Sequence, residues 1–189
     1  MTVSALILAG GKATRLGGVA KHELVIDGET ILARQVRVLV PRVHEILVSS
    51  ATHVTGFRTV RDAVPDAGPL GGIAAGLAAA TTEWLLVVAG DMPDLRGDVL
   101  DLLLAPTELD ASGFRVGDLP EPLLCALRVA VFRPLVEARL AAGDYKASRL
   151  LTSHPRVRWI DPRGVDPELR SLRNVNTAAD LLGASTVTG

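Results

Sequence analysis

Glycines and basic residues gather in the loop that follows the first apolar run of the chain. Two glycine pairs, Gly10-Gly11 and Gly17-Gly18, bracket Lys12 and Arg15, and Lys21 comes shortly after. Glycines let backbone N–H groups converge on an anion, and the basic side chains supply compensating charge. The pattern favours a phosphate-binding loop no more than an ordinary flexible loop with solvated basic residues. It has neither the P-loop spacing nor the Gly-x-Gly-x-x-Gly fingerprint.

A carboxylate stands directly after the most apolar run of the chain. Residues 84–89 predict an interior strand, and Asp91 follows them in Ala89-Gly90-Asp91-Met92-Pro93. Ligands meet α/β sheets at the carboxyl ends of strands. A hard oxygen ligand there can hold Mg²⁺ against triphosphate oxygens. The alternative is a turn-forming or helix-capping aspartate, a common use of that residue before proline.

Two further motifs allow either a structural or a functional interpretation. The stretch Asp66-Ala67-Gly68-Pro69-Leu70-Gly71-Gly72 opens a helix without side-chain bulk. Either a ligand or a tightly packed neighbour can then lie against its start. Near the other end, Asn176 or Thr177 can cap a final helix. The neighbouring amide side chain is then free to contact a metal ion or substrate.

Zinc chemistry and covalent catalysis are not indicated. The four histidines show neither metal-ligand spacing nor an association with cysteine: His22, His44, His53 and His154. The lone Cys125 lies in a predicted strand, where a small buried hydrophobe is more usual than a nucleophile. No Gly-x-Ser-x-Gly elbow is present.

Alternating apolar runs and helical patterns must position these residues. Strands are predicted at 3–8, 45–50, 57–61, 84–89, 123–128 and 157–160. Helices are predicted between the N-cap Thr30 and Pro41, over 69–80, and over 134–142 with Pro134 in its first turn. This alternation predicts an α/β fold with a largely parallel sheet and helices on both faces.

Composition limits the classes of protein further. The 189 residues are 48% hydrophobic and suffice for the single domain that we expect over 1–189. Twenty basic and 21 acidic residues leave a formal charge of −1. The sequence therefore lacks the excess of positive charge that favours binding to nucleic acid or an anionic membrane. Apolar runs too short for a membrane span, no signal-peptide pattern and a single cysteine predict a cytoplasmic protein.

Taken in order, four motifs and Lys21 resemble the molybdenum cofactor guanylyltransferases of the nucleotidyltransferase superfamily. The motifs are Leu8-Ala9-Gly10-Gly11 to Arg15-Leu16-Gly17-Gly18, Gly68-Pro69-Leu70-Gly71-Gly72, Asp91-Met92-Pro93 and Asn174-Val175-Asn176-Thr177. The resemblance implies a three-layer α/β/α, Rossmann-like fold of the nucleotide-diphospho-sugar transferase type. It also implies GTP and Mg²⁺ as ligands and molybdopterin as the phosphorylated acceptor, in a monomer or weak homo-oligomer.

The resemblance also implies roles for individual residues. Nucleotide contacts are expected from Leu8, Ala9, Gly10, Gly11, Lys21, Ser49, Asp62 and Asp91. Arg15, Lys21 and Asp91 are the expected catalytic residues, and Asp91 with Asn176 would hold the metal ion. The chain departs from the family pattern at Ala20, Ser49 and Glu121.

Other functions remain open at this stage. A related nucleotidyltransferase could use adenosylcobinamide phosphate, a sugar 1-phosphate, or CTP with molybdopterin. A non-catalytic nucleotide-binding module belongs to a different class, and Ala20 is the one hint of it. Retention of Asp91, Lys21 and Arg15 favours an enzyme.

Overall fold

A seven-stranded sheet forms the centre of the computed structural model, which describes residues 1–10, 20–62, 64, 66–176 and 180. The strands run in the order β5-β4-β1-β6-β8-β7-β9. Their bounds are β1 Val3–Leu8, β4 Glu45–Ser49, β5 Arg58–Val60, β6 Trp84–Ala89, β7 Ala111–Val116, β8 Leu119–Arg128 and β9 Val157–Ile160. The pairs β1·β4, β1·β6, β4·β5 and β7·β9 are parallel, whereas β8 is antiparallel to both of its neighbours.

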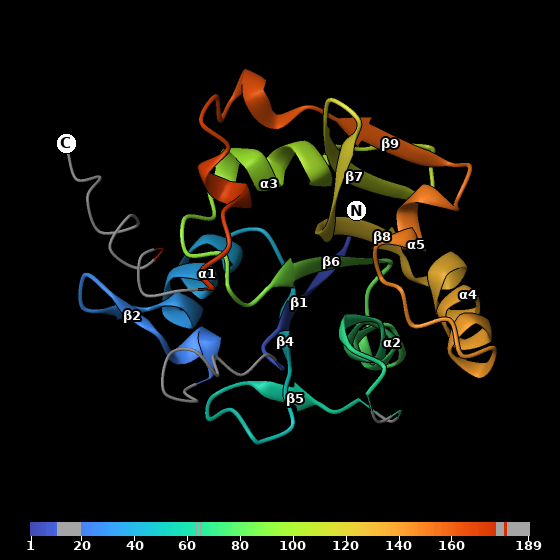
Figure 1. The fold of residues 1–189 in the computed structure, drawn as a ribbon, viewed down its shortest axis with the longest axis horizontal. Coiled ribbons are helices and arrows are strands. Elements are labelled where there is room, and N and C mark those ends of the chain that lie inside the picture. The colour runs from blue at the N-terminus through green and yellow to red at the C-terminus, as the bar shows by residue number, and fades with distance from the viewer. Residues whose placement is uncertain (11–19, 63, 65, 177–179, 181–189) are drawn as a thin grey trace.

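Helices cover both faces of this sheet, as Figure 1 shows. Their bounds are α1 Ile31–Leu39, α2 Pro69–Ala79, α3 Gly97–Leu104, α4 Val129–Ala141 and α5 Arg149–Thr152. One buried cluster joins the sheet to α2, α4 and α5, and the other joins it to α1 and α3. Short 3-10 turns are η2 (Lys21–Glu23), η3 (Pro162–Gly164) and η4 (Arg170–Leu172). The predicted three-layer, mainly parallel α/β fold is confirmed.

Strong local signals explain the elements that surround the site. Every residue of β6 is buried, as expected for a strand with helices on both faces. The Thr30 hydroxyl accepts the Ala33 N–H at 3.1 Å and so caps α1, as predicted. A small hairpin, β2 (Val25–Ile26) and β3 (Glu29–Thr30), turns at Asp27 and Gly28, both with positive φ, the geometry of a tight two-residue turn.

The predicted start of α4 was wrong. The helix was expected over 134–142 with Pro134 in its first turn, but it begins at Val129 and contains Pro134 in its interior. No turn residue separates β8 from α4. Val129, Phe132 and Val136 are buried, so packing in the cluster shared with α2 sets the helix and overrides the break that proline suggests.

The sequence did not predict the hairpin β2–β3, β7, α3 or α5, and for β7 and α3 the local signals are weak. The strand β7 contains Ser112 and Gly113, and both residue types are poor strand formers. Helix α3 is short and has no side-chain cap at Arg96. The helix expected after Asn176 falls on 177–179 and 181–189, outside the described residues. Within the described part of the chain, no helix has both the length and the hydropathy needed to cross a bilayer.

Candidate active site

The ends of four parallel strands meet at one edge of the sheet. Leu8 of β1 pairs with Ser49 of β4 and with Ala89 of β6, and Ser49 also pairs with Val60 of β5. Because these strands end in register, the segments that follow them emerge side by side. Gly10, Asp62 and Asp91 therefore reach the same edge, where α/β proteins place their ligands.

A cavity of roughly 740 Å³ opens at this edge. Seven residues predicted to contact nucleotide line it: Leu8, Ala9, Gly10, Lys21, Ser49, Asp62 and Asp91. The remaining predicted positions there, Gly11 and the catalytic candidate Arg15, lie outside the described residues. The volume is within the range of small-molecule and cofactor sites. His22, Arg61, Asp66 and Leu123 also line the cavity; sequence patterns gave none of them a role, although the first three adjoin or share motifs with predicted site residues.

Lys21 joins the two predicted metal ligands. Its Nζ donates to Asp91 Oδ2 at 2.8 Å and to Asn176 Oδ1 at 2.5 Å. The Lys21 and Asp91 side chains are each only 20% exposed, so solvent screens their ion pair less than it would a surface pair. A carboxylate oxygen and an amide oxygen thus converge on one positive charge. Hard oxygen donors in this arrangement suit a divalent cation as well as an ammonium group.

The turn that carries Asp91 is held from several sides. The buried Gln35 side chain of α1 donates from Nε2 to the carbonyl oxygens of Ala89 at 2.8 Å and Met92 at 3.0 Å. The Val175 N–H donates to the Asp91 carbonyl at 2.9 Å. These contacts hold the backbone on both sides of Asp91, because the carbonyl groups of Ala89, Asp91 and Met92 all accept hydrogen bonds from buried residues. The backbone in turn limits where the Asp91 side chain can point. Catalytic side chains require such support.

Gly90 is required by the close approach of β1 and β6. Its N–H donates to the Leu8 carbonyl at 3.0 Å, and a Cβ at this position would lie 2.6 Å from that same oxygen. Gly90→Ala should lower the free energy of unfolding by about 1–3 kcal/mol, because backbone atoms must shift. Urea denaturation measures the change. Gly164→Ala is the matched control, since its Cβ meets no atom within 4 Å, and an equal effect of the two substitutions would contradict this explanation.

The glycine-rich start of α2 serves packing. A Cβ on Gly71 would collide with the Asp62 carboxylate, and a Cβ on Gly72 would lie 2.6 Å from the Ser49 hydroxyl. The two glycines therefore leave room for protein side chains, and this space sets where Asp62 and Ser49 stand along the cavity wall. Gly72 also lines the cavity itself.

Glu121 is a carboxyl group beside Asp91 that sequence reasoning noted only as a departure from the family pattern. Glu121 belongs to β8, the strand that pairs with β6, and it lies close enough to Asp91 for the two charges to interact. Burial raises the pKa of Glu121, the Leu123 N–H that it accepts at 3.1 Å lowers it in part, and the charge of Asp91 raises it again. Because this placement depends on the pairing of two strands that are not consecutive in the sequence, spacing alone could not reveal it.

Burial shifts the pKa values of two other titratable residues. Cys125 is fully buried, and burial raises the pKa of its thiol to about 12, so the nucleophilic thiolate is not available at neutral pH. Burial also lowers the pKa of His22, which therefore stays neutral. Among the described residues, no group of three or more His, Cys, Asp or Glu side chains could hold a metal ion.

Residues 5–157 match the family model described as the MobA-like NTP transferase domain. A probable molybdenum cofactor guanylyltransferase from Chloroflexus aggregans is 34% identical over 96% of this chain and 92% of its own length. A molybdenum cofactor guanylyltransferase from Burkholderia cenocepacia is 33% identical over 82% of this chain and 84% of its own.

Solved structures agree on the fold. A molybdopterin-guanine dinucleotide biosynthesis protein A from Archaeoglobus fulgidus has a TM-score of 0.79 at 24% identity, with 96% of both chains covered. A 2-C-methyl-D-erythritol 4-phosphate cytidylyltransferase from Thermus thermophilus has a TM-score of 0.73 at 20% identity, with 98% of both chains covered. At these identities the likeness extends to the fold alone.

Proposed function

This chain belongs to the MobA-like NTP transferase family, and from that premise we propose that it transfers GMP from GTP to the terminal phosphate of molybdopterin with release of pyrophosphate. One observation carries the proposal at the level of residues. Lys21 and Asp91 form an ion pair in the lining of a cavity that Leu8, Ala9 and Gly10 also line. The choice of GTP and molybdopterin is supported by the names of relatives that match most of the chain.

Magnesium is the proposed cofactor, and the residues present fit it. Asp91 supplies a carboxylate oxygen and Asn176 an amide oxygen, both within 2.8 Å of the Lys21 ammonium. Mg²⁺ prefers oxygen ligands and usually takes one or two carboxylates plus substrate phosphates rather than a complete protein cage. When bound, the ion supplies charge stabilisation to the phosphate oxygens.

The chain's own residues orient the reactants and offset charge. An oxygen of the acceptor phosphate forms a bond to the α-phosphorus of GTP as the bond to the pyrophosphate oxygen breaks, and its electron pair leaves with pyrophosphate. The acceptor is already ionised at neutral pH, so alignment and charge neutralisation matter more than a general base. Lys21 would meet the nucleotide phosphates, and Arg15 would assist it there.

Pyrophosphate release tests this function directly. The full chain is incubated with Mg²⁺ and with GTP, CTP or ATP, each combined with molybdopterin, adenosylcobinamide phosphate or a sugar 1-phosphate. Release with GTP and molybdopterin is the expected result. Release with another pair would assign a different member of the superfamily, and tight GTP binding without release under any pair would identify a non-catalytic nucleotide-binding module.

A further inference from the structure

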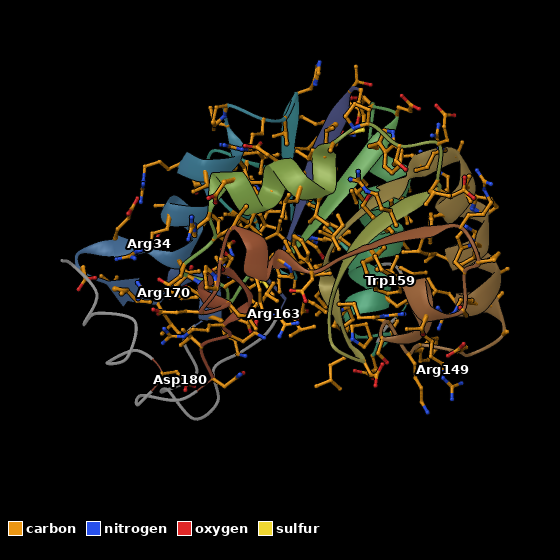
Figure 2. All side chains as sticks on the ribbon, turned by 90° about the horizontal axis from the view of Figure 1, so that it is seen from above. Arg34, Arg149, Trp159, Arg163, Arg170 and Asp180 are labelled. Atoms are coloured by element: carbon orange, nitrogen blue, oxygen red, sulfur yellow. The ribbon has the colours of Figure 1, made fainter. Side chains whose placement is uncertain are left out.

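A second cavity, of roughly 620 Å³, lies beside the segment that follows Asp91. Its wall comes from four separate parts of the chain: Asp27 in the β2–β3 turn, α1, residues 93–96 after β6, and residues 166–173. The charged side chains lining it are Asp27, Arg34, Arg37, Asp94, Arg96, Asp166, Glu168, Arg170 and Arg173. Arg34 and Arg170 lie on the same side of the molecule (Figure 2). None of these residues entered the proposed chemistry.

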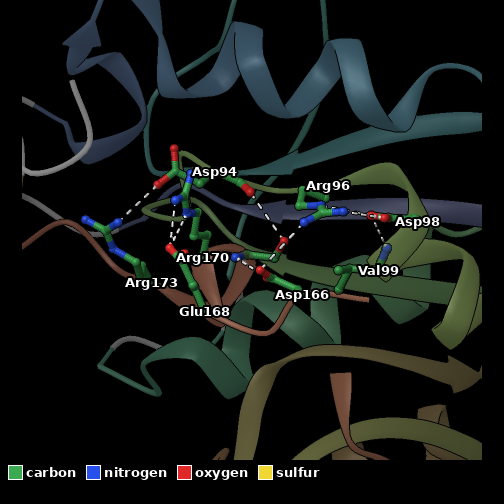
Figure 3. A network of polar contacts seen from close by, with 9 residues as sticks. Asp94, Arg96, Asp98, Val99, Asp166, Glu168, Arg170 and Arg173 are labelled. Carbon is green, nitrogen blue, oxygen red and sulfur yellow. Dashed lines mark hydrogen bonds and ion pairs between the residues drawn. The ribbon is translucent and has the colours of Figure 1, made fainter. Parts of the chain in front are cut away.

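Asp94 is a partly buried carboxylate of this cavity that pairs with Arg173. Burial raises its pKa, and the positive charges of Arg173, Arg34 and Arg170 act in the opposite direction. Arg173 Nη1 lies 4.0 Å from Asp94 Oδ2, and the Asp94 side chain is only 20% exposed (Figure 3). Arg34 comes from α1, whereas Arg170 and Arg173 come from the C-terminal segment. Arg34 pairs with Asp27 at 3.2 Å and Arg170 with Glu168 at 2.7 Å, so of these three arginines it is Arg173 that forms its ion pair with Asp94.

The segments that meet at Asp94 are those that carry the proposed metal ligands. Asp91 precedes Asp94 by three residues, and Asn176 follows Arg173 by three. Two hydrogen bonds also join these segments. The Val175 N–H donates to the Asp91 carbonyl at 2.9 Å, and the Ser171 hydroxyl donates to the Asp94 carbonyl at 3.3 Å. Any separation of these two segments would therefore also separate Asp91 from Asn176.

We propose that Asp94 is a positioning residue of the transfer site, whose carboxylate pairs with Arg173 and so holds residues 170–176 against the segment after β6, which keeps the oxygens of Asp91 and Asn176 converged. This inference rests on the proposed function, because it assigns those oxygens to a divalent cation. Asp94 itself does not line the nucleotide cavity. Its effect is transmitted through the two segments, as supporting residues around metal ligands commonly act.

Asp94→Asn tests this role because it removes the charge and keeps the side-chain shape. The probe is Mn²⁺, with its binding to the full-length protein measured by electron paramagnetic resonance in the absence of nucleotide. We expect about tenfold weaker Mn²⁺ binding. The Mg²⁺ concentration for half-maximal pyrophosphate release should rise similarly, with a much smaller change in kcat at saturating Mg²⁺. Asp94→Glu should restore most of the affinity.

The matched control is Asp98→Asn, an identical substitution at an exposed residue that pairs with Arg96 two positions away. It should leave Mn²⁺ affinity unchanged. Equal affinities for Asp94→Asn and wild type would overturn the proposal, as would a lower thermal midpoint with normal Mn²⁺ affinity, which would reveal a role in stability alone. Wild-type protein that binds no Mn²⁺ and releases no pyrophosphate would overturn the proposed function, and this inference with it.

Discussion

Replacement of Asp91 by alanine should reduce pyrophosphate release on the order of a thousandfold or more, because it removes the carboxylate assigned to the cation at the reacting phosphates. The loss should appear in kcat as well as in kcat/KM, since charge stabilisation matters most in the transition state. Steady-state kinetics with GTP and acceptor, at several Mg²⁺ concentrations, measure it. Raising Mg²⁺ should not restore the rate.

The fold of the Asp91 variant is expected to persist. The turn is held through backbone atoms, by Gln35 and by the Val175 N–H, and none of these contacts uses the Asp91 side chain. Asp101→Ala is a suitable control, because Asp101 is 59% exposed and pairs with Arg42 away from the cavity. A near-normal rate for Asp91→Ala, with the control also active, would remove Asp91 from the mechanism.

The central elements were predictable because their local signals agree with their packing. Buried runs specify β1 and β6, and a capping hydroxyl specifies the start of α1. Prediction failed where tertiary contacts decide. The start of α4 follows from the burial of Val129 and Phe132, and β7 forms around Gly113 because it is paired on both sides. Propensity is a weak guide at such positions.

The candidate site, too, was predictable from the sequence only in part. The positions of Gly10 and Asp91 follow from the ends of parallel strands, which any sheet of this class brings together. The contact of Lys21 with Asn176 spans 155 residues, and no local pattern encodes it. Glu121 comes near Asp91 because β8 lies beside β6 in the sheet, although the two strands are not consecutive in the sequence. Motif order thus indicated the residue types, whereas their mutual geometry required the fold.

Replacement of Lys21 by alanine should change two measurements in opposite directions. Lys21 now occupies the Asp91 and Asn176 oxygens assigned to the divalent cation. Without its ammonium group, those oxygens lose a competing positive charge, so the nucleotide-free protein should bind Mn²⁺ several-fold more tightly. Turnover should nevertheless fall by about a hundredfold, because the charge that meets the nucleotide phosphates is missing.

This pair of results would distinguish Lys21 from a residue that only maintains structure. A structural lysine would weaken Mn²⁺ binding and turnover together, since both depend on the folded cavity. Mn²⁺ titration without nucleotide and steady-state kinetics with GTP supply the two values. Lys146→Ala is the control, because Lys146 is exposed and its hydrogen bonds to Arg139 and Asp144 use its backbone carbonyl and N–H. Unchanged kinetics for Lys21→Ala would exclude it from phosphate binding, and unchanged Mn²⁺ affinity would show that its ammonium group does not compete with the cation for the Asp91 and Asn176 oxygens.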